Sequence, residues 1–167
     1  AGNRATVTDP LGHVTTRGYD ARDRLVTITE PAGGGTTTLA YDAHSRLTAV
    51  TDPVGNTTSY AYDAADRLAT ETDPRGKVTT LAYDAAGRQA AVTDRDGRTT
   101  SYAYDAADRP TSETWVNPLG GSPLNLVTYS YDNADRLTQV QDQFSKYAYT
   151  YDDADRLLTV DDAGTAG

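Results

Sequence analysis

The sequence predicts an all-β protein, built as a continuous antiparallel meander of about seven hairpins that forms a curved β-sheet ribbon. Three observations predict it: a repeat of about 21 residues, two turn signals in each copy, and short β-type stretches between the turns. The period is strict enough that residues 57–67 and 99–109 are identical. We therefore expect a single repeat array over residues 1–167.

Each copy is marked by a Tyr-Asp dipeptide, followed four residues after the aspartate by an arginine. Tyr-Asp occurs seven times, at spacings of 22, 21, 21, 21, 27 and 20 residues. We interpret these three columns as structural repeat positions. They are Tyr19, Asp20 and Arg24; Tyr41, Asp42 and Arg46; Tyr62, Asp63 and Arg67; Tyr83, Asp84 and Arg88; Tyr104, Asp105 and Arg109; Tyr131, Asp132 and Arg136; and Tyr151, Asp152 and Arg156.

The repeat unit contains two turn signals, of which the Tyr-Asp turn recurs in every copy. One is Asp-Pro-x-Gly, at residues 9–12, 52–55 and 73–76 with variants at 30–33 and 117–120, and it has the residue preferences of a type I turn. The other begins at the aspartate of Tyr-Asp, whose side chain can accept a hydrogen bond from the backbone N–H two residues on.

The stretches between the turns, such as KVTTLAYD, are rich in Thr, Val, Tyr and Leu and too short for helices. Two strands per copy give about fourteen strands, and no helix is expected. Open sheets seldom exceed ~10 strands without curling, so the ribbon should curve. Its two unpaired edges should pair with further repeats.

Side-chain columns follow from the strand period of two. Tyr60 and Tyr62 should share a face, stacked on Tyr or Leu of neighbouring copies. The apolar columns that begin at Leu25 and Ile28 are three residues apart, which places them on opposite faces unless a bulge intervenes. The Asp and Arg columns should form an ion-pair ladder along one rim, each exposed pair worth only ~0–1 kcal/mol.

Composition excludes several classes of protein. Only 37% of residues are hydrophobic, mean hydropathy is -0.62, and the aromatic residues are twelve Tyr, one Trp and one Phe, which suits a thin, half-hydrated structure. The net charge of -9 argues against nucleic acid as a partner. No apolar run reaches the ~20 residues of a membrane span, and without a signal peptide the chain is either cytoplasmic or a piece of a longer protein.

Candidate chemistry is sparse, and we predict no catalytic residue, cofactor or metal. His13 and His44 lie in different copies without a nucleophile motif. The aspartates could pair as in a glycosidase, but their turn positions account for them. The segment DRDGR at residues 94–98 has the look of a calcium loop, yet its arginines oppose a cation.

One copy is irregular, with a longer hairpin loop at about residues 115–126. Trp115 makes this the candidate binding loop, because exposed aromatic residues recognise sugars and protein partners. The alternative is that Trp115 packs on neighbouring repeats in a longer turn. For Phe144, in the last short turn, we expect local packing.

The Tyr-Asp-Ala-x-Gly/Asp-Arg-Leu, Thr-Asp-Pro-x-Gly and Thr-x-Tyr-x-Tyr-Asp segments resemble the YD repeat of the rearrangement-hotspot (Rhs) family, over essentially the whole chain. The resemblance implies a β-sheet ribbon that spirals into a hollow shell or tube, which encloses a toxin in bacterial members. It also implies a bacterial extracellular or cell-surface setting within a longer secreted protein.

Two classes of function remain. The first is a structural wall of a shell, tube or fibre, with further YD repeats as partners and an encapsulated toxin as cargo. The second is a cell-surface module that binds carbohydrate or protein through its tyrosine columns and Trp115. Columns that stay uniform favour the wall, whereas a local break with exposed aromatic residues favours binding.

Overall fold

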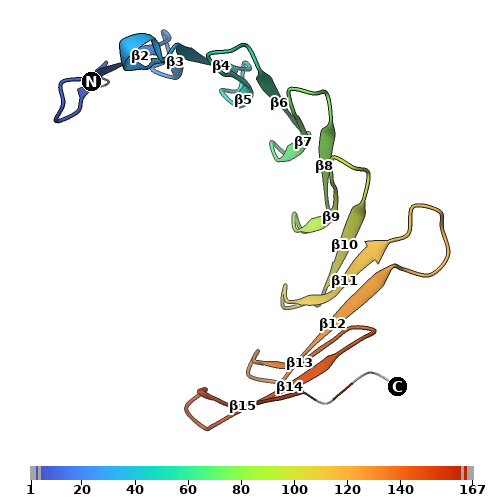
Figure 1. Ribbon diagram of the computed structural model, residues 1–167. Coiled ribbons are helices and arrows are strands. Elements are labelled where there is room, and N and C mark those ends of the chain that lie inside the picture. Colours follow the sequence, from blue (N-terminus) through green and yellow to red (C-terminus); the bar gives the residue numbers. More distant parts are fainter. Residues whose placement is uncertain (1–2, 4, 163, 165–167) are drawn as a thin grey trace. The chain divides into compact units, whose positions relative to one another are not determined.

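The computed structural model confirms the predicted fold class, and it describes residues 3, 5–162 and 164. The strands form an open antiparallel meander in which strand order follows chain order from β1 to β15. Within each unit, Figure 1 shows successive strands side by side, joined by hairpin loops. The ends of the predicted array, at residues 1, 2, 4, 163 and 165–167, lie outside the described part of the chain.

The fifteen strands exceed the expected number by one, because β1 precedes the first Tyr-Asp copy. The chain divides into two compact units, residues 1–79 and 80–167, each described by itself. The strands are β1 (Thr6–Thr8), β2 (Val14–Tyr19), β3 (Leu25–Thr29), β4 (Thr36–Tyr41), β5 (Leu47–Thr51), β6 (Thr57–Tyr62), β7 (Leu68–Thr72), β8 (Val78–Tyr83), β9 (Gln89–Thr93), β10 (Thr99–Tyr104), β11 (Pro110–Val116), β12 (Asn125–Tyr131), β13 (Leu137–Gln141), β14 (Lys146–Tyr151) and β15 (Leu157–Asp162).

The expectation of no helix is wrong at one place. A short 3-10 helix, η1 (Pro31–Gly33), replaces the regular turn between β3 and β4. This copy reads Glu-Pro-Ala-Gly-Gly-Gly, and Ala32 adopts a positive φ of 55°. The glycines that follow let the chain turn back into β4.

The two turn signals fold into the same three-residue hairpin loop. In the Pro-Gly turns, which begin at the Asp of Asp-Pro-x-Gly, Gly55 N–H donates to Asp52 O at 3.0 Å and Asp52 N–H to Asn56 O at 2.9 Å. In the Tyr-Asp turns, which begin at the Asp of Tyr-Asp, Asp66 and Asp63 repeat the pattern. Both are type I turns closed by a residue with positive φ, as three-residue hairpins require.

A β-bulge follows each Tyr-Asp turn and decides which face the apolar columns occupy. Leu39 pairs with Val50 and Tyr41 pairs with Leu47, with the register shift between Ala40 and Tyr41. Directly paired residues share a face, so Leu47 and Val50 lie together on the face of Tyr41. The expectation of apolar columns on opposite faces is therefore wrong. We call this side the aromatic face; Thr, Ser and Ala dominate the other.

The sheet has no second layer packed on it within either unit. Among the described residues no hydrophobic side chain is buried, and the one buried polar residue is Asn125, which is 8% exposed. No helix in this part of the chain is long and apolar enough to cross a membrane. Without a core, stability must come from cross-strand pairs, turns and contacts between successive copies.

The long hairpin loop is shorter than predicted, because strands take part of it. Strand β11 continues to Val116 and β12 starts at Asn125, which leaves residues 117–124 as the loop. Figure 1 shows this loop projecting beyond the neighbouring turns of its unit.

Candidate functional site: the arginine nodes of the Tyr-Asp turns

The aspartate that begins each Tyr-Asp turn binds both the turn backbone and the arginine four residues later. Oδ1 of Asp105 accepts hydrogen bonds from the backbone N–H of Ala107 at 2.9 Å and of Arg109 at 3.0 Å. Oδ2 accepts a hydrogen bond from Nε of Arg109 at 2.7 Å and forms an ion pair with its Nη2 at 2.6 Å. One short carboxylate therefore closes the turn and fixes the guanidinium.

These contacts lower the pKa of Asp105 below its ordinary value. The hydrogen bond from the Arg109 side chain is the largest cause; desolvation acts against it, and the backbone N–H groups of Arg109 and Ala107 add to the lowering. All of these donors favour the charged carboxylate. The turn is therefore built around an ionised aspartate.

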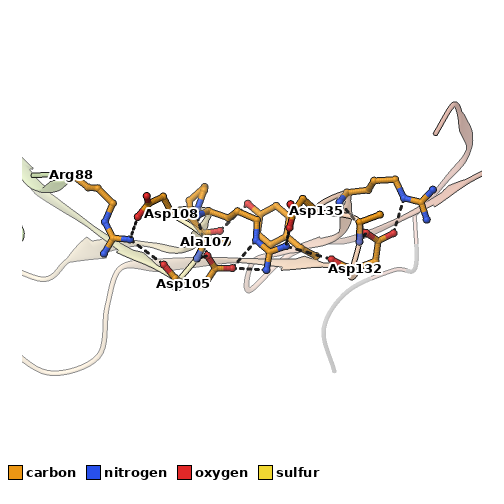
Figure 2. A network of polar contacts seen from close by, with 11 residues as sticks. Arg88, Asp105, Ala107, Asp108, Asp132 and Asp135 are labelled. Carbon is orange, nitrogen blue, oxygen red and sulfur yellow. Dashed lines mark hydrogen bonds and ion pairs between the residues drawn. The ribbon is translucent and has the colours of Figure 1, made fainter. Parts of the chain in front are cut away.

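The same arginine reaches into the next copy of the repeat. Nη1 of Arg109 donates to Oδ1 of Asp135 at 2.6 Å and to the backbone carbonyl of Asp132 at 3.4 Å. Figure 2 shows the equivalent step one copy earlier, where Arg88 points towards Asp105 and Asp108. Arg88 and Arg109 thus each join two consecutive Tyr-Asp turns.

The tyrosine of the next copy completes the arrangement. The guanidinium carbon of Arg109 lies 4.6 Å from the ring centroid of Tyr131, within the range of a cation–π interaction. The Tyr131 hydroxyl donates back to the carbonyl of Pro110 at 2.8 Å. We call this set, an arginine with its own aspartate and the tyrosine and turn of the next copy, an arginine node.

Complete arginine nodes recur in both units with nearly constant geometry. The distances from guanidinium carbon to tyrosine centroid run from 4.6 to 5.0 Å. The nodes are centred on Arg24, Arg46, Arg88, Arg109 and Arg136. Arg67 makes the same contact with its own Asp63. The structure thus brings together the predicted Tyr, Asp and Arg columns, from consecutive copies.

The predicted ladder of exposed ion pairs understates these contacts. The side chain of Arg109 is only 27% exposed and has four polar contacts and an aromatic ring around it. Charges in such a network contribute more than isolated surface pairs do.

Sequence reasoning missed the residue with positive φ in the Tyr-Asp turns. Asp66, Asp108, Asp135 and Asp155 have φ of 61–64° and accept Nη1 of the preceding copy's arginine. Ser45 takes the same place for Arg24 at 3.2 Å. Glycine is the usual residue at a position with positive φ. An aspartate that recurs there in place of glycine was therefore the sign that its side chain has a second role.

The node at Arg156 is half formed. Nε and Nη2 of Arg156 contact Asp152 at 2.8 and 2.7 Å, as elsewhere. The Arg156 side chain is 80% exposed; among the described residues no other side chain contacts its guanidinium, and no tyrosine donates to the Leu157 carbonyl.

The other candidate residues form no second cluster. His13 pairs with Asp9 at 2.8 Å in its own turn, and His44 lies in a different one. In the calcium-like loop, Nε of Arg98 donates a hydrogen bond to Oδ2 of Asp94 at 2.7 Å. The oxygen that would have to bind a calcium ion is therefore already paired with an arginine. The described residues contain no group of three or more His, Asp or Glu placed to hold a metal.

Trp115 is half exposed on its strand. It lies on β11 opposite Thr100 and Asn125, is 48% exposed, and donates its indole N–H to Oε1 of Glu113 at 2.9 Å. The expected local packing of Phe144 is also wrong, since it is 67% exposed in its turn.

Comparison with known proteins agrees with this geometry. The family model described as RHS Repeat matches residues 1–37, 41–78, 62–99 and 83–114. No curated protein matches the sequence.

The solved structures that match include a Tc holotoxin pore and a complex of TcdB2 with TccC3 and Cdc42. The Photorhabdus luminescens Tc holotoxin pore has a TM-score of 0.75 at 20% identity, over 89% of this chain and 9% of that one. TcdB2-TccC3-Cdc42 has a TM-score of 0.67 at 19% identity, over 92% of this chain and 9% of that one. Similarity at this level shows the fold, and the chain spans about a tenth of the length of these proteins.

We expect Arg109→Ala to destabilise the protein far more than Arg156→Ala. The first removes a complete node that joins two copies, whereas the second removes only a contact within one turn. Thermal unfolding followed by circular dichroism should show a midpoint lowered by several degrees for Arg109→Ala and nearly unchanged for Arg156→Ala. Equal shifts for the two variants would contradict the node as a link between copies.

Acid should weaken the protein only below about pH 5. The pKa values of all seven aspartates that begin the Tyr-Asp turns are lowered in the folded chain. Their stabilisation is therefore present above the unfolded-state pKa and is lost as pH falls through the folded-state values. Unfolding midpoints should stay level from pH 7 to about pH 5 and then fall; a decline centred near pH 6 would refute this assignment.

Replacement of Asp108 separates its backbone role from its ion pair. Asp108→Ala should cost about 1 kcal/mol, since alanine tolerates its φ of 62° poorly and the contact with Arg88 is lost. The stability of Asp108→Gly should stay within about 0.5 kcal/mol of wild type. Glycine tolerates this φ better than aspartate does, and that gain offsets the stability lost with the ion pair to Arg88. Gly87, with a φ of 87°, shows that the repeat accepts glycine here. Urea denaturation would measure both.

Proposed function

We propose that this chain, which belongs to the RHS repeat family, is one array over residues 1–167 that builds part of the wall of a hollow shell, tube or extracellular fibre. The family match and the likeness of fold to toxin-complex proteins support the proposal. So does the arrangement itself, since a one-layer sheet whose copies are linked by nodes is suited to form part of a wall. Its work is done by shape and by continuation of the sheet.

The half-formed node at Arg156 carries this proposal. The guanidinium of Arg156 and the carbonyl of Leu157 are in place for the tyrosine and turn of a further copy. Leu157, Leu158 and Val160 of the same strand are exposed, and β15 has no neighbour beyond it among the described strands. An edge of this kind is a template for one more strand.

The partner at this edge is a further YD repeat, of the same or a neighbouring chain. It would supply a tyrosine whose ring covers Arg156 and whose hydroxyl donates to Leu157, as Tyr151 does to Leu137 at 2.8 Å. It would also supply Tyr-Asp-x-x-Asp, so that Nη1 finds a carboxylate. The Tyr-Asp-x-x-Asp segment found in this chain is thus the segment that would complete its own edge.

The wider setting follows the family resemblance. We propose a bacterial extracellular or cell-surface location within a longer secreted protein, and a toxin domain as cargo of the complete shell. The neighbouring structures contain TccC3 with TcdB2, a pairing of this general kind in those proteins.

We expect the purified chain to associate through this edge. Sedimentation velocity over a range of concentrations should show rising mass, and negative-stain electron microscopy should show ribbons or tubes. Arg156→Glu should reduce association, because it places a like charge beside Asp152 and the incoming carboxylate. Val160→Lys tests the same strand without touching the turn.

The matched control is Arg75→Glu, which makes the same charge change in an exposed Pro-Gly turn. It should associate like wild type. A chain that stays monomeric at every concentration, or variants that all behave alike, would count against edge-to-edge continuation.

A further inference from the structure

We propose that the hollow between Trp115 and Arg98 binds a neutral carbohydrate, stacked on the indole ring. The site is independent of the wall proposed above, because it lies on the aromatic face near the Pro-Gly turns and uses no arginine node. It is confined to the unit formed by residues 80–167.

The hollow is formed by β9, β10 and β11 and by the end of the inserted loop. Its volume is about 350 Å³, and its lining includes Val92, Arg98, Tyr102, Trp115, Val116 and Leu124. Small-molecule sites begin at about this size, with mostly apolar walls and a few polar groups. The space suits one sugar ring, with an extended chain leaving through the open side.

The insertion itself creates the hollow. Tyr60 pairs with Glu71 in one copy and Tyr102 pairs with Glu113 two copies later, so Trp115 stands where Asp73 begins a turn. Because this copy has six extra residues, β11 continues beyond the position equivalent to Asp73. Trp115 therefore lies in a strand, whereas the equivalent residue begins a turn in the other copy. A large aromatic ring thus stands on the aromatic face where other copies have an aspartate.

The polar groups around Trp115 leave the ring face as its binding surface. The indole N–H is already donated to Glu113 at 2.9 Å, which also orients the ring. The CH-rich face of a sugar packs well on such a ring. Nη1 of Arg98 makes no hydrogen bond among the described residues, so it can donate to a sugar hydroxyl.

Charge and hydrogen bonding exclude the other common ligands of an exposed tryptophan. A cation would meet the guanidinium of Arg98 at the rim of the hollow. An anion would meet Asp94 and Asp96 beside that arginine and Glu113 beside the indole. A proline-rich peptide would stack on the aromatic ring but would find no indole N–H for its carbonyl groups, because that N–H is already donated to Glu113. A neutral ligand with hydroxyl groups and an apolar face fits what is left.

Trp115 is the only tryptophan of the chain, so its fluorescence reports on this site alone. We would titrate maltotriose, cellotriose and chitotriose into the wild-type protein. At least one should give a saturable change in intensity or wavelength. Calorimetry with that sugar should show binding about ten-fold weaker for Arg98→Ala, as expected for one lost hydrogen bond, and no binding for Trp115→Ala.

Two further variants keep the test decisive. Trp115→Phe retains a ring and should retain measurable binding, and Phe144→Ala removes another exposed aromatic residue and should bind like wild type. Circular dichroism and the unfolding midpoint of each variant separate lost binding from lost folding.

Three results would overturn the proposal. One is the absence of a saturable response to any of the three sugars up to their solubility. Another is sugar binding that survives Trp115→Ala in a folded protein. The third is a response to a proline-rich peptide without any response to the sugars, which would make the hollow a peptide site.

Discussion

The arginine node is the interaction on which the rest of this structure depends. A one-layer sheet without buried hydrophobic side chains cannot be stabilised by a core, so neighbouring copies must be joined by something else. The node does this at the turns, where Arg109 binds Asp105 of its own copy and Asp135 and Tyr131 of the next. Backbone pairing alone would connect the same strands but would fix neither turn conformation nor register.

The node also explains why the chain repeats itself so closely. Each arginine needs an aspartate four residues earlier and a tyrosine and a second acceptor one copy later, so a change in one column disturbs two copies. The positive-φ position shows the limits of this constraint: Asp108 and Ser45 both supply an oxygen there, and Gly87 supplies only the backbone conformation. The positive-φ position makes one side-chain contact and varies between copies. The Tyr, Asp and Arg columns each make several contacts and are the same in every copy.

The sequence predicted the all-β class, the Tyr-Asp and Pro-Gly turns and the columns, because these depend on local residue preferences and on the period. It did not predict which face the apolar columns share. That outcome depends on bulges such as the one beside Tyr41, which leave no mark in the order of residues. The reach of Arg109 into the next copy was likewise hidden, since the spacing gives the two turns but not the direction of a long side chain. The exposure of Trp115 depends on strand β11 continuing through what reads as a turn.

The two kinds of turn therefore have different tasks within each unit. The Tyr-Asp turns carry the nodes, and an insertion there would separate an arginine from its partners. The Pro-Gly turns close the same three-residue loop with glycine and carry no arginine node, so they can lengthen without breaking the nodes. The insertion at residues 117–124 occurs at a turn of this second kind, and it is where the chain departs most from its repeat. A sheet whose copies are linked along one row of turns can vary in sequence and length along the other.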